Sequence, residues 1–147
     1  MEIIDIHSKK QGKALSNFYP HSFEIDGIEC NSMEGFLQSL KYRNPKKQVK
    51  ICTYVGAEAK NKGKFKFWWR LSGNIYWQGK KIKRVSKDFD LLIERAYDCL
   101  FQNENFKKSL LETKGKQLCH TIGKHNKKAT ILTEEEFISN LNRLRDN

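Results

Sequence analysis

Three side chains that could act together chemically, Glu34, Gln38 and Lys41, lie close to one another in the sequence. Their spacing of four and then three residues places them on one face if the segment is an α-helix. An acid, an amide and an amine on one face can exchange protons and hold a polar ligand through hydrogen bonds. The same spacing is typical of a solvated helical stripe with i,i+4 hydrogen bonds, so both interpretations stay open on this pattern alone.

The loop that precedes this face is rich in groups that bind nucleotides. It reads SNFYP and contains Ser16, Asn17, Phe18 and Tyr19. Aromatic rings stack on bases, and hydroxyl and amide groups bind sugar hydroxyls. The alternative for Phe18 and Tyr19 is that they close the hydrophobic core.

A second aromatic segment is interleaved with cations. It places Phe67, Trp68, Trp69 and Trp77 among lysines and arginines that end at Arg84. Such mixtures suit single-stranded nucleic acid or a nucleotide, whereas strand alternation would put the aromatics in the core and the lysines outside. The formal net charge of +11 favours polyanionic partners, although a lysine-rich solvated surface gives the same total.

Several classes of protein and site find no support in the sequence. The four cysteines (Cys30, Cys52, Cys99 and Cys119) form no CxxC motif, so we expect reduced thiols and no metal. Cys119 and His120 are adjacent and point in different directions, which disfavours a nucleophilic dyad. There is no dinucleotide or P-loop fingerprint. We find no signal peptide and no apolar stretch of the roughly 18 residues that a membrane span needs, and expect a cytoplasmic protein.

The first half of the chain must position the Glu34 face. We predict a strand at 2–6, a loop at 8–20 and a hairpin around Asp26-Gly27, a strong turn signal between apolar-alternating halves. Asn31 or Ser32 should cap a helix that ends at Asn44-Pro45. A second helix follows at about 46–55 with Gly56 as its C-cap, and 57–63 should form one or two further helical turns.

The second half is predicted to be mostly helical. Residues 64–73 break the helical pattern, and 74–77 with 80–84 form a second hairpin. Helices are predicted at 87–101 after Ser86, at 104–112 after Asn103, and at 134–145 after a Thr133/Glu136 capping box. The pattern does not predict how 114–130 folds. The chain is therefore expected to be a helix-rich α+β protein, one domain over 1–147, with short β-hairpins.

The pattern LSNFYPxxFxxDGxxxxxxEGFLQxxK, residues 15–41, resembles the signature of the NADAR superfamily, also called YbiA-like. The remainder is similar to one branch of that family. It contains a Tyr-Trp-x-Gly-Lys segment at 76–80 followed by Arg84, an LxHT-type segment at 118–121 and an ILTEEEF helix start at 131–137. The resemblance therefore implies a YbiA-like fold.

The resemblance implies cleavage of N-glycosidic bonds in ribosylated substrates, without a cofactor. One branch is similar to glycosidases of early riboflavin-pathway intermediates. Another removes ADP-ribose from guanine in DNA, and some members act as antitoxins or in phage counter-defence. The Trp-Gly-x-Gly stretch of the riboflavin branch is absent here, and no tryptophan follows Trp77. We therefore expect a monomeric enzyme for ADP-ribosylated DNA or a nucleotide that contains ADP-ribose.

The resemblance also implies roles for the candidate residues. Glu34 would stabilise the oxocarbenium-like transition state or activate water, and Lys41 would trap the opened ribose as a Schiff base. Gln38 and Asn17 would bind the ribose hydroxyls, and Phe18 or Tyr19 would stack on the base, with Ser16 and Trp77 as further binding candidates. Arg84 and His120 would contact pyrophosphate or product.

Three alternatives stay open on the sequence. The covalent partner could be Glu34 or Lys41. The substrate could be a free riboflavin-pathway ribosylamine. The third alternative is a non-catalytic module that binds ADP-ribose or nucleic acid.

Overall fold

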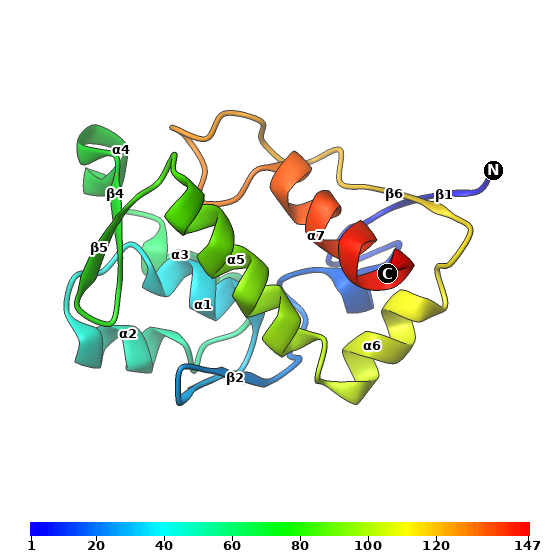
Figure 1. The fold of residues 1–147 in the computed structure, drawn as a ribbon, viewed down its shortest axis with the longest axis horizontal. Helices are drawn as coiled ribbons and strands as arrows, with labels where there is room; N and C mark the ends of the chain where they lie inside the picture. The colour runs from blue at the N-terminus through cyan, green and yellow to red at the C-terminus, as the bar shows by residue number, and fades with distance from the viewer.

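The computed structural model describes all residues from 1 to 147 and forms three two-stranded sheets connected by helices (Figure 1). The hairpin of β2 (Phe23–Ile25) and β3 (Ile28–Cys30) turns at Asp26 and Gly27, whose φ angles are 51° and 78°. Positive φ at both central positions is what a tight hairpin turn requires. The hairpin of β4 (Asn74–Trp77) and β5 (Lys80–Lys83) uses Gln78 and Gly79 in the same way.

Capping side chains define the helices of the first half. Ser32 caps α1 (Met33–Ser39) by accepting a hydrogen bond from the backbone amide of Gly35. Asn44 caps α2 (Pro45–Ile51), where Pro45 occupies the first turn. The buried amide of Gln48 on α2 donates to the carbonyls of Ser39, Tyr42 and Tyr76, and thereby fixes α1, α2 and β4 to one another.

The remaining helical elements are, in chain order, the 3-10 turn η1 (Lys13–Leu15), α3 (Gly56–Gly63), α4 (Trp68–Ser72), α5 (Lys87–Leu100), α6 (Glu104–Leu111) and α7 (Glu134–Asp146). Ser86, Asn103 and the Thr133/Glu136 capping box begin the last three helices, as predicted. The fold is helix-rich α+β, which confirms the predicted class.

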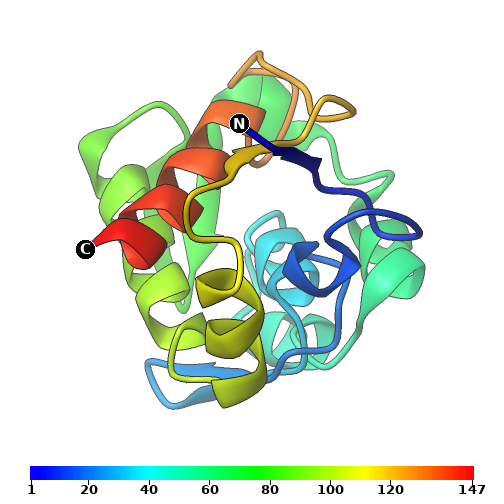
Figure 2. The same cartoon turned by 90° about the vertical axis from the view of Figure 1, so that its right-hand side faces the viewer.

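A parallel strand pair closes the molecule. Strand β1 (Ile3–Asp5) lies beside β6 (Gln117–Cys119), with Ile4 opposite Leu118. Figure 2 shows these two short strands side by side next to α7. Both β6 and α7 thereby come to lie against the segment that precedes the SNFYP loop.

One continuous hydrophobic core joins the elements. Helix α5 runs diagonally across the molecule, with α7 and α6 on one side and the α1, α2 and α3 group on the other (Figure 1). Phe89, Ala96 and Tyr97 of α5 are fully buried, as are Phe36 and Leu40 of α1. No helix in the chain is both long and apolar enough to cross a membrane. All four cysteines are free thiols.

Some predicted boundaries are wrong. Helix α1 ends at Ser39 rather than at Asn44, and Gly56 begins α3 instead of capping α2. Helix α4 was not expected, because its aromatic run has no helical period. The β1–β6 ladder lay outside the prediction because its partners are separated by most of the chain.

Arg84 has a structural role at the end of β5. Its side chain is buried and makes two hydrogen bonds to the Glu136 carboxylate, at 2.6 and 3.1 Å, and one to the carbonyl of Thr130. The guanidinium also lies 4.2 Å from the ring centroid of Phe89. This ion pair ties the second hairpin to the start of α7.

We expect Arg84→Met to lower the free energy of unfolding by about 3 kcal/mol, because it leaves the Glu136 carboxylate poorly solvated without its partner. Urea denaturation measures the change. Arg95→Met is the matched control, since the Arg95–Asp26 pair is about half exposed on both sides and should lose less than about 1 kcal/mol. Equal losses in the two variants would contradict the structural role of Arg84.

Candidate active site

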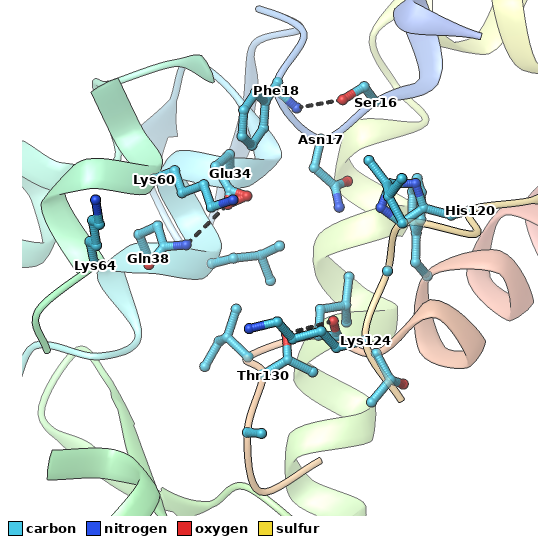
Figure 3. Close-up of a pocket in the computed structure, with 18 of the residues that line it drawn as sticks. Ser16, Asn17, Phe18, Glu34, Gln38, Lys60, Lys64, His120, Lys124 and Thr130 are labelled. Carbon is cyan, nitrogen blue, oxygen red and sulfur yellow. Dashed lines mark hydrogen bonds between the residues drawn. The ribbon is translucent and has the colours of Figure 1, made fainter. Parts of the chain in front are cut away.

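A cavity of about 360 Å³ lies where α1, α3, the SNFYP loop and the segment after β6 meet (Figure 3). Seven of the residues predicted from the sequence line it: Ser16, Asn17, Phe18, Glu34, Gln38, Lys41 and His120. The Glu34 face is therefore not a solvated stripe, and it forms one wall of this cavity.

Glu34 is the centre of this wall. Its side chain is buried, and the Gln38 amide donates a hydrogen bond to its Oε2 atom at 3.1 Å. Burial raises the pKa of the Glu34 carboxyl, while the hydrogen bond from Gln38 and the positive charges of Lys41 and Lys60 oppose that change without cancelling it. A carboxyl with a raised pKa can both accept and donate a proton near neutral pH.

Lys41 follows Leu40, the C-cap of α1, and therefore lies just beyond the helix on which it was predicted. Burial lowers its pKa to about 8, against the attraction of Glu34 and with the help of nearby cations such as Arg70. Its Nζ atom is 3.4 Å from the carbonyl oxygen of Gly63 and 5.9 Å from the ring centroid of Trp69. A lysine in this environment is partly a neutral amine at physiological pH.

Close packing against α3 holds the Gln38 side chain in place. A Cβ atom added at Gly63 would lie 1.8 Å from the Oε1 atom of Gln38 and 3.2 Å from Cδ of Lys41. A side chain at position 63 would therefore displace the side chains of Gln38 and Lys41. The Oε1 atom of Gln38 is buried and has no hydrogen-bond partner. It faces Gly63 of α3.

The SNFYP loop is bonded directly to the start of α1. The carbonyl of Asn17 accepts a hydrogen bond from the backbone amide of Glu34 at 3.0 Å. The hydroxyl of Tyr97, buried on α5, donates to Oδ1 of Asn17 at 2.7 Å. The amino group of the Asn17 side chain is then left to face the cavity (Figure 3). Lys60 lies 6.0 Å from the ring centroid of Phe18.

His120 enters the cavity from the opposite side, directly after β6. Its Nδ1 atom lies 2.8 Å from the carbonyl oxygen of Ile6. A carbonyl only accepts hydrogen bonds, so Nδ1 carries the proton and Nε2 is the free nitrogen of the neutral ring. The backbone amide of His120 donates to Glu134, and Phe137 packs edge-on against the ring.

Sequence reasoning missed most of the cations that line the cavity. Besides Lys41 they are Lys60, Lys64, Arg70 and Lys124, and Glu34 is the only acid in the lining. The i,i+4 spacing of Lys60 and Lys64 on α3 was a usable signal. Lys124 and Thr130 lie on the segment whose fold the sequence did not predict, so no local pattern could have placed them.

Three predicted site residues lie outside the cavity. Trp77 is a core residue that donates a hydrogen bond to Asp26 at 2.7 Å, and Arg84 is paired with Glu136. Tyr19 packs on His21 with 4.5 Å between ring centroids. The site proposed below therefore does not include them.

We expect Gly63→Ala to displace the side chains of Gln38 and Lys41, and to lower the activity or ligand affinity of this site at least tenfold, since about 1 Å of misplacement has effects of this order or larger. Asn61→Ala on the exposed face of α3 is the matched control. Titration of ADP-ribose by calorimetry measures the effect. Equal affinity in the two variants would show that the packing of Gly63 against Gln38 does not shape the site.

Comparisons with known proteins agree with this architecture. A family model described as Bacteriophage protein GP30.3 matches residues 10–146. A relative from Enterobacteria phage T4, "Uncharacterized 17.1 kDa protein in Gp30-rIII intergenic region", is 39% identical over 135 residues, which are 90% of this chain and 89% of the relative. The NMR structure of the E. coli protein YbiA has a TM-score of 0.64 at 18% identity, and the match covers 99% of this chain and 83% of YbiA. The chain therefore belongs to the bacteriophage GP30.3 protein family and has the fold of the E. coli protein YbiA.

Proposed function

We propose that the protein is an N-glycosidase that removes ADP-ribose from guanine in DNA. The observation that carries the proposal is that the buried Glu34 carboxyl shares one cavity with Lys41, whose pKa is lowered to about 8, and that the other charged groups of this cavity are cations. In a phage-encoded family this activity would reverse a DNA ADP-ribosylation defence in the host cytoplasm.

The charge of the cavity suits the proposed substrate. ADP-ribose carries a pyrophosphate with two negative charges, and Lys60, Lys64, Arg70 and Lys124 line the same cavity as Glu34. Cations bind phosphate oxygens through charge-assisted hydrogen bonds. A substrate without phosphate groups would leave these charges unmatched, so the lining favours a phosphorylated substrate such as one that contains ADP-ribose.

Lys41 is the proposed nucleophile. Its neutral amine attacks C1 of the ribose that bears guanine, a bond forms between Nζ and C1, and the bond between C1 and the guanine nitrogen breaks. The ribose ring then opens to a lysine imine. Water adds to this imine and releases ADP-ribose with the free amine restored. No oxidant or reductant is needed at any step.

Glu34 is the proposed proton carrier. It accepts the proton that Lys41 loses and passes it to the departing guanine, so the two groups share one proton in the reactive state. The Gln38 amide orients the Glu34 carboxylate at 3.1 Å. The free amino group of Asn17 supplies a hydrogen bond for the ribose hydroxyls, and Nε2 of His120 is an acceptor on the opposite wall.

We expect the wild-type protein to release ADP-ribose from an oligonucleotide that carries ADP-ribosylated guanine. Glu34→Gln and Lys41→Met should each lower the rate at least 100-fold, as loss of a nucleophile or proton carrier does. Chromatography of the released ADP-ribose measures the rate. Borohydride should trap the wild-type protein on the sugar and leave Lys41→Met unlabelled.

Lys87→Met, on the exposed side of α5, is the control and should retain the wild-type rate. Absence of release by folded wild-type protein would refute the DNA substrate. Release from a free ribosylamine alone would then assign the other glycosidase activity. Binding of ADP-ribose with no turnover of either substrate would identify a binding module.

The pH dependence follows from the two pKa shifts. Below the raised pKa of Glu34 the pair holds two protons, and above about 8 Lys41 has lost its proton and the pair holds none. We therefore expect a bell-shaped profile of kcat/KM, with an acid limb above the ordinary carboxyl range and an alkaline limb near 8. Rates measured from roughly pH 5 to pH 10 would contradict the shared proton if they kept rising above about pH 9.

A further inference from the structure

A second hollow, of about 840 Å³, lies beside the candidate active site. Lys41 and Trp69 line both the cavity and this hollow, so the two are adjacent through these side chains. The second hollow is bounded by α4, the start of α2 and strand β4, at the end of the molecule where α4 lies in Figure 1. The mechanism above uses none of its residues except Lys41.

The lining of this hollow is positively charged. Arg43, Lys47 and Lys66 contribute to it, and none of its twelve lining residues is an acid. The guanidinium of Arg43 lies 5.3 Å from the ring centroid of Tyr76, and Nζ of Lys66 lies 4.6 Å from that of Tyr42. Arg43 and Lys66 therefore each lie over an aromatic ring, an arrangement that suits a phosphate beside a stacked base.

The rim of the hollow exposes unusually large apolar side chains. Trp68 is 74% exposed, Leu71 is 73% exposed, and the neighbouring Phe67 is 51% exposed. The rings of Phe67 and Trp68 are stacked with 6.4 Å between centroids. Large exposed aromatic groups that lie close together on one short helix indicate a contact surface, whereas apolar side chains scattered singly over a surface do not.

We propose that this hollow and the exposed face of α4, called here the α4 groove, bind the single-stranded DNA next to the modified base. The inference rests on the proposed function for the identity of the base in the cavity. The strand's phosphates contact Arg43, Lys47 and Lys66, and an unpaired neighbouring base stacks on Trp68. Lys41 and Trp69 form the passage between groove and cavity.

Charge complementarity favours nucleic acid over a protein as the occupant. An acid-free basic lining repels a second copy of a chain with net charge +11. Exposed aromatic rings stack on bases of any sequence when those bases are unpaired, whereas duplex bases hide their faces. The groove therefore predicts a preference for single strands without strong sequence dependence.

The test measures binding of an unmodified, fluorescein-labelled strand of about 12 nucleotides, a length within the usual range for such sites. Fluorescence anisotropy should show micromolar or tighter binding to the single strand and at least tenfold weaker binding to the matching duplex. Trp69 and Trp77 are buried and Trp68 is exposed, so the strand should quench tryptophan fluorescence in the wild type, and Trp68→Phe should lose most of that quenching.

Trp68→Ala should raise Kd about tenfold, while Trp68→Phe, which retains a stacking ring, should raise it less. Lys66→Ala should weaken binding and reduce the slope of log K against log salt by about 0.7, the value for one phosphate contact on a single strand. Lys108→Ala removes an exposed lysine from α6, at the other end of the molecule, and should change neither quantity.

The outcomes separate this inference from the proposed function. Weak binding that is equal for single strand and duplex, or binding that Trp68→Ala and Lys66→Ala leave unchanged, would overturn the α4 groove. Either result would refute the α4 groove even if the protein cleaved free ADP-ribosylated guanosine. Binding at the groove without turnover of any ADP-ribosylated substrate would support the groove and refute the glycosidase.

Discussion

The burial of the Glu34 carboxyl is the constraint on which the site depends. A carboxylate removed from water needs hydrogen bonds or positive charges in place of its hydration, or it binds a proton. Around Glu34 these replacements are only partial. The Gln38 amide supplies one hydrogen bond, and cations around the cavity supply the remaining attraction at longer range. The raised pKa of Glu34 and the lowered pKa of Lys41 therefore have one shared cause, which is the exclusion of water by the close contact of α1 with α3.

That contact is specified by small and local features. Gly63 lets α3 approach Gln38, and the Asn17 carbonyl bonds to the backbone amide of Glu34 at the first turn of α1. Tyr97, from a helix distant in sequence, orients the Asn17 side chain. The signature that resembles the NADAR superfamily thus describes a physical unit: a loop, a hairpin and a helix that together hold one carboxyl out of water.

Local chemistry made much of the fold predictable. Ser32, Ser86, Asn103 and Thr133 cap helices as their sequence context indicated, and Asp26-Gly27 turns the first hairpin. Six of the seven site residues were predicted because the loop and helix face are contiguous in sequence, and the seventh, His120, was predicted from the LxHT-type segment. Trp77 and Arg84 were included for their chemistry, but their side chains lie in the core, where burial and the Glu136 pair determine their position. Helix α4 and the 120–133 wall depend on tertiary packing, which no short pattern encodes.

The β1–β6 pair determines when, during folding, the protein becomes able to bind its substrate. His120 is held by the carbonyl of Ile6, across a separation of 114 residues. Closing so long a loop is slow compared with forming α1 and its hairpin. During synthesis the Glu34 unit can assemble while the opposite wall is still inside the ribosome. Substrate binding should therefore arise abruptly and late, and a nascent chain that already contains Glu34, Gln38 and Lys41 would still lack a complete site.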